Sequence, residues 1–288
     1  MNYRVLLYYK YVPLSDPEQF LVQHRLLCQK LKLTGRILIA DEGLNGTLAG
    51  TIEATEQYKQ ALWAMAEFKD IEFKEHLYHE NPFAKLKIKY RKELVALGVE
   101  DIKADQATQH LLPEDWHALA AQPDAIVMDV RNNYESKIGK FKNAIVPDIA
   151  NFRELPAWMA KHQELKDKKV LIYCTGGIRC EKASAVLKKS GVGEVYQLHG
   201  GIINYGKHIP DGLWEGSCFV FDQRMSVPVN DPEHHYPISH CQTCATKTDQ
   251  YYNCANVECN ALMLQCDTCR QRDRYCLECL PQFAAAVN

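Results

Sequence analysis

A short, uninterrupted apolar run that ends in a cysteine constrains this chain most. Residues 169–174 are Lys-Val-Leu-Ile-Tyr-Cys, and residues 125–130 form a second run of the same kind, Ala-Ile-Val-Met-Asp-Val. Runs of this length without alternation are typical of strands that are buried on both faces of a parallel sheet. Helical stretches separate these runs, and residues 179–190 predict a helix before another strand at 195–198. The sequence therefore predicts an α/β domain with a parallel sheet.

The first 98 residues follow a different order of elements. We expect strands over 3–12, 36–40 and 47–49, further extended segments at 71–77 and 83–94, and helices over 15–33 and 52–68. Asn45-Gly46 has the residue types of a two-residue hairpin turn. The order β-α-β-β-α-β predicts a ferredoxin-like, or acylphosphatase-like, α+β domain.

Length and composition set the number and class of the domains. The chain has 288 residues, of which 47% are hydrophobic and 24% charged, which is a globular composition with room for two or three cores. The polar stretch 98–111 indicates a linker, so we expect regions at 1–98, 99–217 and 218–288. The N-terminal apolar run is too short for a signal peptide and no stretch approaches a membrane span, which predicts a cytoplasmic protein without membrane contact.

Eight of the twelve cysteines form four close pairs near the C-terminus. In a large chain without an export signal, such pairs indicate metal ligands rather than disulfides. Two tetrahedral all-thiolate sites need eight thiols, and zinc is the default metal for them. The sequence leaves open whether the pairs combine in chain order or alternate, and we expect the neighbouring His240 to be a surface residue. The cysteine-rich region is therefore predicted to hold two structural zinc ions through Cys241, Cys244, Cys254, Cys259, Cys266, Cys269, Cys276 and Cys279.

Cys174 opens a loop that is suited to hold a reactive thiolate. Two glycines and Arg179 follow it, and the next helix begins there. The helix N-terminus and the guanidinium both favour negative charge, so they should depress the pKa of the Cys174 thiol. A cysteine at a strand end is often only a small buried side chain, but Gly-Gly and Arg at this spacing favour a nucleophile. We predict Cys174 and Arg179 as catalytic residues, in an active-site loop that also contains Thr175, Gly176, Gly177, Ile178 and Cys180.

The spacing of this loop carries a resemblance to a known family. Cys174 and Arg179 enclose four residues, one fewer than in a cysteine-based phosphatase loop. Together with Asp129-Val130-Arg131 and Leu198-His199-Gly200-Gly201-Ile202, the loop resembles a rhodanese domain over roughly residues 110–216. Cys180 has either a chemical role, as a resolving thiol or sulfur relay, or only a structural one, as a side chain packed beneath the loop.

The flanking motifs narrow the resemblance to one group of rhodanese-related proteins. Gly35-Arg36-Ile37, the segment Glu42-Gly43-Leu44-Asn45-Gly46-Thr47 and the segment Cys218 to Arg224 resemble the rhodanese-related tRNA uridine hydroxylases. This resemblance spans nearly the full chain. It implies oxygen-dependent conversion of the wobble uridine to 5-hydroxyuridine, with the tRNA anticodon loop as partner, molecular oxygen as co-substrate and Cys174 as the essential cysteine. Two departures, Leu44 for Ile and Tyr205 for Trp, lie outside the reactive loop.

A basic segment at 85–91 is the candidate RNA-binding surface. It alternates cations with Leu86, Ile88 and Tyr90, so a strand would turn the three apolar side chains to the core and the cations to one face. Such a face can follow a phosphate backbone, although a solvated or edge-protecting face has the same pattern. The predicted RNA-binding residues are Lys85, Lys87, Lys89 and Arg91.

Two functions from different classes compete for the same loop. The first is a tRNA hydroxylase in which the Cys174 thiolate adds to C6 of the uracil. The alternative is a rhodanese-type sulfurtransferase that carries a persulfide on Cys174. A non-catalytic zinc-dependent interaction module is disfavoured, because Cys174 and Arg179 are both present. No flavin, haem or non-haem iron motif is found, so no organic cofactor is expected.

Overall fold

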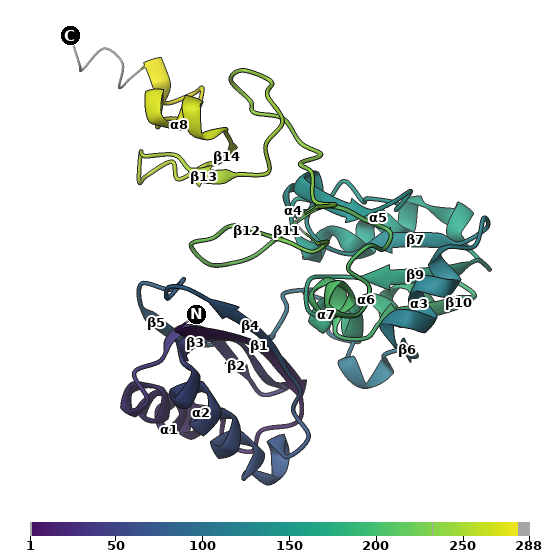
Figure 1. The fold of residues 1–288 in the computed structure, drawn as a ribbon. Coiled ribbons are helices and arrows are strands. Elements are labelled where there is room, and N and C mark those ends of the chain that lie inside the picture. Colours follow the sequence, from purple (N-terminus) through teal and green to yellow (C-terminus); the bar gives the residue numbers. More distant parts are fainter. Residues whose placement is uncertain (1, 232, 282–288) are drawn as a thin grey trace.

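The computed structural model describes residues 2–231 and 233–281 (Figure 1). An α+β region, a parallel-sheet region and a small cysteine-rich region follow one another along the chain. Within these ranges no helix is both long and apolar enough to cross a membrane.

The N-terminal region is a five-stranded sheet in the order β4-β1-β3-β2-β5. β3 is antiparallel to its neighbours β1 and β2, β4 is antiparallel to β1, and β5 lies at the edge parallel to β2. The two helices cover one face of this sheet (Figure 1). The arrangement is the predicted ferredoxin-like fold with β5 as an additional edge strand. Its elements are β1 (Tyr3–Tyr11), α1 (Pro17–Lys30), β2 (Thr34–Ala40), β3 (Gly43–Thr51), α2 (Ile52–Trp63), the 3-10 turn Ala66–Phe68, β4 (Phe73–Tyr78) and β5 (Leu86–Tyr90).

Alternation along β1 decides which side chains face the helices. Leu6 and Tyr8 are buried in the core beneath α1 and α2, so Leu7 and Tyr9 point to the opposite face of the sheet. α1 begins after Asp16, whose carboxylate accepts a hydrogen bond from the backbone N–H of Gln19 at 2.8 Å. This region thus has one face filled by its own helices and one face left for the rest of the chain.

The predicted hairpin turn at Asn45-Gly46 is wrong. Both residues lie inside β3, and the two-residue connection is Asp41-Glu42, because Ala40 pairs with Gly43. Gly46 is needed for packing instead, since a Cβ atom there would lie 2.2 Å from the Tyr8 hydroxyl. A turn-forming residue type was therefore mistaken for a turn.

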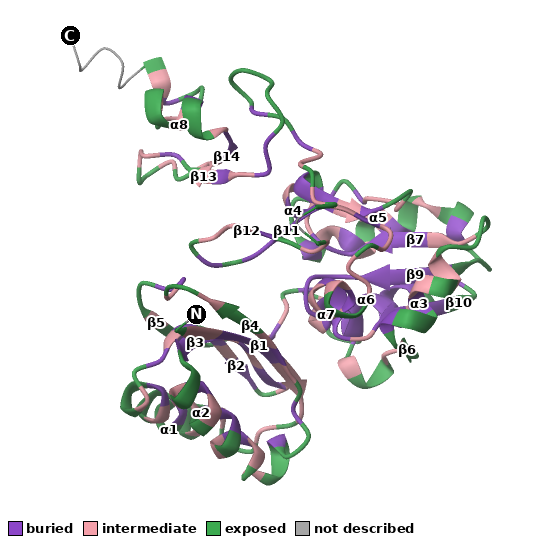
Figure 2. Cartoon of the chain, viewed as in Figure 1, coloured by how far each residue is buried: buried purple, intermediate pink, exposed green. Residues whose placement is uncertain are grey.

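The central region contains four parallel strands in the order β6-β10-β9-β7. α5 and α6 pack on one face, and α3 and α7 pack on the other with Trp116 in their core. Figure 2 shows the buried residues concentrated in β7, β9 and α6. The prediction of a buried parallel sheet is confirmed. The elements are the 3-10 turn Ala104–Gln106, β6 (His110–Leu111), α3 (Pro113–Ala120), β7 (Ile126–Asp129), α4 (Asn133–Ile138), β8 (Gly139–Phe141), the 3-10 turn Phe152–Glu154, α5 (Leu155–Lys161), the 3-10 turn Gln163–Leu165, β9 (Lys169–Tyr173), α6 (Ile178–Lys189), β10 (Glu194–Leu198) and α7 (Gly201–His208).

A second small sheet connects the central region to the cysteine-rich region. β11 (Trp214–Phe219) lies between β8 and β12 (Ser226–Pro228), and it runs across the boundary predicted between 217 and 218. Beyond it, β13 (Tyr251–Asn253) and β14 (Leu262–Leu264) form a hairpin that is followed by α8 (Asp267–Arg272). The rings of Phe219 and Tyr251 are 5.6 Å apart, so the hairpin is seated on the end of β11.

Candidate active site

The loop after β9 places Cys174 at the N-terminus of α6. Gly177 precedes the first helical residue and has φ of 102°, a conformation that L side chains rarely adopt. A Cβ atom on Gly177 would also lie 2.9 Å from the Tyr9 hydroxyl of the N-terminal sheet. The glycine therefore allows both the sharp turn and the close approach of the two regions.

The surroundings of the Cys174 sulfur favour its ionised form. The backbone N–H of Gly177 donates to Sγ at 3.1 Å. Complete burial raises the pKa of Cys174, but the Cys180 thiol, the Arg179 charge and the backbone N–H groups of Arg179 and Cys180 outweigh it and lower that pKa to about 6. Burial and the neighbouring Cys174 raise the pKa of Cys180 well above its usual value. Cys180 is thus a neutral donor beside a thiolate at neutral pH.

Arg179 is held in place by a partner that the sequence did not reveal. Its two terminal nitrogens donate to the two carboxylate oxygens of Glu135 at 2.5 and 2.8 Å, and Glu135 is fully buried. Nη2 also reaches the Thr175 hydroxyl at 3.3 Å. This bidentate pair fixes the guanidinium beside the loop and compensates part of its charge. Glu135 is a site residue that sequence reasoning missed, because nothing in the spacing relates it to a residue 44 positions later.

The segment that carries Glu135 is anchored by a second buried pair. Arg131 donates to both carboxylate oxygens of Asp129, at 2.9 Å from Nε and 2.6 Å from Nη2, and to the carbonyl of Gly139 at 2.6 Å. Its guanidinium lies over the rings of Tyr173 and Trp214. The Asp-Val-Arg motif therefore has a structural task, because it joins the end of β7 to Gly139 just beyond α4 and so fixes the short helix that carries Glu135.

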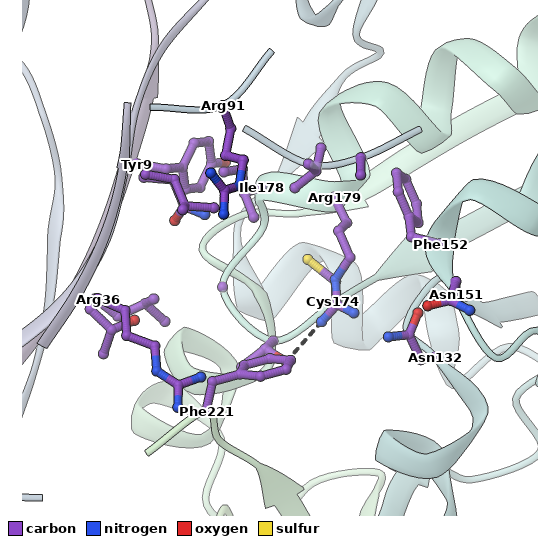
Figure 3. Close-up of a pocket in the computed structure, with 18 of the residues that line it drawn as sticks. Tyr9, Arg36, Arg91, Asn132, Asn151, Phe152, Cys174, Ile178, Arg179 and Phe221 are labelled. Carbon is purple, nitrogen blue, oxygen red and sulfur yellow. Dashed lines mark hydrogen bonds between the residues drawn. The ribbon is translucent and has the colours of Figure 1, made fainter. Parts of the chain in front are cut away.

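A cavity of about 620 Å³ lies above the loop, between the N-terminal sheet and the central region. Cys174, Thr175, Gly176, Ile178 and Arg179 line one side of it. Figure 3 shows Tyr9 and Arg36 on the opposite wall, with Asn132 and Phe152 beside the loop. The volume suits a bound group of the size of a nucleobase or larger.

The wall opposite the loop is the uncovered face of the N-terminal sheet. Strand register puts Leu7, Thr47, Arg36 and Lys87 in one row across β1, β3, β2 and β5. The next row along the same face contains Tyr9, Asn45, Leu38 and Lys89. All eight side chains line the cavity. Arg36 is a second site residue whose role the sequence did not single out.

The structure separates the predicted basic residues into two groups. Lys87, Lys89 and Arg91 line the cavity above Cys174, whereas Lys85 lines an adjoining hollow. One detail of the predicted alternation is wrong: Tyr90 is 38% exposed and its hydroxyl donates to Asp41 at 3.0 Å. β5 is an edge strand near its end at this point, so no core lies beneath Tyr90.

Direct bonds connect α6 to the N-terminal region. The Tyr9 hydroxyl donates to Glu181 at 2.7 Å. The ammonium of Lys182, which is only 1% exposed, contacts Glu42 at 2.9 Å and Glu93 at 3.1 Å. Because β2 and β5 are parallel neighbours, Glu42 and Glu93 lie at the same end of the N-terminal sheet, and the helix that carries the reactive loop is fixed to that end.

The eight C-terminal cysteines form two clusters in which the four ligand atoms lie within 4.8 Å of one another. The pairs alternate along the chain, first with third and second with fourth, which resolves the arrangement that the sequence left open. His240 is exposed and belongs to neither cluster. Four sulfurs at this separation suit one tetrahedral metal ion, so each cluster could hold one. The clusters are Cys241, Cys244, Cys266 and Cys269, and Cys254, Cys259, Cys276 and Cys279.

Known proteins match this chain over nearly its whole length. Proteins named tRNA uridine(34) hydroxylase are 47% identical in Bacillus velezensis, over 91% of this chain and 83% of that protein, and 43% identical in Chlamydia muridarum, over 96% and 85%. A Bacillus licheniformis protein of the same name is 48% identical over 90% of this chain and 82% of that protein. The chain belongs to the tRNA uridine(34) hydroxylase family. This membership confirms the resemblance that was predicted from the loop and its flanks.

Family models divide this member of the tRNA uridine(34) hydroxylase family into three parts. The UPF0176 acylphosphatase like domain matches residues 3–94, the Rhodanese-like domain matches 112–208 and the Rhodanase C-terminal model matches 215–282. The predicted fold class of each region is thereby confirmed. The cavity lies where the first two of these parts meet.

Proposed function

We propose that this protein hydroxylates the wobble uridine of tRNA at C5, with Cys174 as the nucleophile. The observation that carries the proposal is a thiol of low pKa at one side of a cavity whose other wall is a cationic sheet. The names of its relatives give the substrate class and the reaction. Catalysis by a cysteine with a pKa near 6 needs no separate base to ionise it at neutral pH.

The N-terminal region supplies the groups that recognise the RNA. Lys87, Lys89 and Arg91 offer three cations to phosphates, with Lys85 next to them. A base that is splayed out of the anticodon loop enters the cavity between them and Cys174, as recognition of single-stranded RNA usually requires. Arg36 and Asn45 lie on the same wall and can contact the base or its sugar.

The chemistry begins with addition of the thiolate to the base. A bond forms between Sγ and C6 of the uracil, and the C5–C6 electron pair moves onto C5 and O4. Arg179, which Glu135 holds in position, offsets the charge that develops. C5 of this adduct is nucleophilic and attacks molecular oxygen, the co-substrate that the family resemblance implies, to give a C5 hydroperoxide. Two electrons from an external thiol reductant then cleave the O–O bond, so that one oxygen atom stays as the C5 hydroxyl and the other leaves as water. Because the Cys174 pKa is low, the sulfur is also a good leaving group when the double bond is restored.

The two cysteine clusters complete the proposal as structural sites. Four thiolates that can surround one ion tetrahedrally favour zinc, so we assign one zinc ion to each cluster. The ions would hold the cysteine-rich region together and take no part in the reaction. The proposal also includes the predicted regions at 1–98, 99–217 and 218–288 and the predicted location in the cytoplasm.

The alternative, a sulfurtransferase with a persulfide on Cys174, fits the loop but not the cavity. A small sulfur donor such as thiosulfate needs little space, whereas about 620 Å³ faced by Arg36, Lys87 and Lys89 suits a nucleotide. The family that the chain belongs to also favours RNA.

Nucleoside mass spectrometry of intact tRNA tests the proposal directly. A strain that lacks the protein should lose 5-hydroxyuridine and its derivatives, and the wild-type chain should restore them. The Cys174→Ser chain should not. Unchanged tRNA in the deletion strain together with lost thiosulfate:cyanide activity would support the sulfurtransferase instead.

A further inference from the structure

Two further hollows adjoin the cavity above Cys174. The first, of about 430 Å³, is lined by Lys85 and Lys87 of the N-terminal region and by Tyr252 and Asn253 of the cysteine-rich hairpin. The second, of about 500 Å³, lies between that hairpin and Tyr134 and Lys137 of α4, with Gln242 on its wall. Arg36 lines both hollows and the cavity, and Phe221 lines the cavity and the second hollow. The three spaces therefore meet at these two side chains.

We infer that the two hollows form one groove for the RNA strand beside the target nucleotide, so that the cysteine-rich hairpin is a wall of the substrate site. The inference rests on the proposed function and extends it from the target base to its neighbours.

The charge in the groove favours a polyanion. In the described part of the chain, Arg36, Lys85, Lys87 and Lys137 have no ion-pair partner. Asp222 is the acid that lines both hollows, and its carboxylate is bound by Arg224 at 2.9 and 2.6 Å. Four uncompensated cations and one neutralised acid give a positive path, as phosphate groups require.

Phe221 adds a stacking surface at the junction. Its side chain is 43% exposed although it is large and apolar, and it stands between the cavity and the second hollow. Figure 3 shows its ring directed into the cavity that holds Cys174 and Arg179. An exposed aromatic ring beside free cations is the pairing that single-stranded nucleic acid binds, because every base has a face to stack.

The hairpin is fixed firmly enough to act as a wall. The Tyr251 hydroxyl donates to the carbonyl of Tyr134 at 2.8 Å, and Ser217 is hydrogen-bonded to Asp249. Cys254 follows β13 directly and belongs to one cluster, whereas Cys266 lies just beyond β14 and belongs to the other. Both clusters therefore brace the strands that line the groove.

The test adds one negative charge to each hollow. Gln223 lines the first and Gln242 the second, so the full-length Gln223→Glu/Gln242→Glu chain places two carboxylates in the groove without altering the cavity above Cys174. The matched control is Tyr236→Glu/Val257→Glu, which adds the same charge at positions that are 48% and 87% exposed and line neither hollow. Metal content and thermal unfolding, measured on both chains, establish that each is folded.

Binding is measured with an unmodified anticodon stem-loop and with a uridine trinucleotide. The groove variant should raise Kd for the stem-loop about tenfold and change Kd for the trinucleotide little, because charge repulsion acts only where phosphates reach. The control should leave both values near those of the wild type. Equal stem-loop affinity in variant and control would overturn the inference, as would an equal loss for both RNAs. Absence of 5-hydroxyuridine formation by the wild-type chain on the stem-loop would instead overturn the proposed function.

Discussion

Cys174 and the eight cysteines from Cys241 to Cys279 are the same side chain in opposite surroundings. Cys174 has one thiol neighbour, Cys180, and a backbone N–H at 3.1 Å. Each C-terminal cysteine has three other sulfurs within 4.8 Å. Amide hydrogens and a guanidinium stabilise a single thiolate, whereas four thiolates together need a cation between them.

The difference shows how one residue type is kept reactive in one place and inert in another. The Cys174 loop leaves the sulfur facing a cavity, with its charge balanced from behind. The clusters direct four sulfurs at one another, so a bound metal ion would neutralise much of the thiolate charge and make each sulfur a weaker nucleophile. Reactivity here depends on what faces the sulfur and not on the abundance of cysteine.

The largest effect should come from removing the reactive sulfur. Cys174→Ser should lower the rate of 5-hydroxyuridine formation by about 10⁴-fold or more, because the nucleophile is lost while little packing changes. Cys28→Ala is the control, since Cys28 is a fully buried thiol in the core of the N-terminal region. Mass spectrometry of tRNA nucleosides measures both rates. Comparable activity in the Cys174→Ser and Cys28→Ala chains would show that the loop cysteine is not the nucleophile.

Metal removal should destabilise the C-terminal cysteine clusters, the other side of the comparison. A carefully reduced preparation should contain about two zinc ions per chain by elemental analysis, and chelation should unfold the hairpin before the parallel sheet. Hydrogen exchange at residues 251–264, compared with exchange in the parallel sheet, measures which of the two unfolds first.

Paired substitutions then test the alternating arrangement. Cys241→Ser/Cys266→Ser removes two ligands of one cluster and should cost one ion, whereas Cys241→Ser/Cys254→Ser touches both clusters and should cost two. Loss of the same number of ions in both would contradict the arrangement.

Smaller changes should move the Cys174 pKa without removing the sulfur. Arg179→Ala and Cys180→Ala each remove a group that lowers the pKa from its usual value to about 6, so each should raise it by about one unit or more. Alkylation by iodoacetamide, which rises with pH as the thiolate forms, should therefore have its midpoint at higher pH. Glu135→Gln should move the midpoint the opposite way, because it leaves the Arg179 charge uncompensated. An unchanged midpoint in Arg179→Ala with weaker tRNA binding would make Arg179 a phosphate anchor instead.

The smallest effect concerns the cationic wall. Lys87→Glu/Lys89→Glu should weaken tRNA binding and reduce the slope of log K against log salt by about two at most, since two phosphate contacts are lost. Lys161→Glu/Lys166→Glu is the matched control on exposed lysines away from the cavity. Equal slopes in the two variants would mean that β5 is only a charged edge.

The sequence was sufficient wherever function depended on neighbours along the chain. The run 169–174, the glycines and Arg179 predicted a strand, a loop and a helix that the structure contains. Reasoning from residue type failed at Asn45-Gly46, where the glycine makes room for Tyr8. It also failed at Tyr90, because an edge strand has no core beneath its end.

Long-range partners were beyond such reasoning. Glu135 meets Arg179, and Arg36 meets the cavity, only through the packing of separate sheets and helices. The alternation of the cysteine pairs likewise follows from the path of the β13–β14 hairpin and not from spacing.

The contacts of Lys182 have a geometric consequence. Glu42 lies in the turn after β2, and Glu93 lies just beyond the parallel strand β5, so one buried ammonium joins α6 to the same end of both strands. These contacts hold the Cys174 sulfur at a fixed distance from the row of cations on the N-terminal sheet. Under the proposed function, a nucleotide reacts only if the distance from its phosphate to its base matches the distance from the cations to the sulfur. A base that does not extend far enough from the bound phosphate never reaches the thiolate.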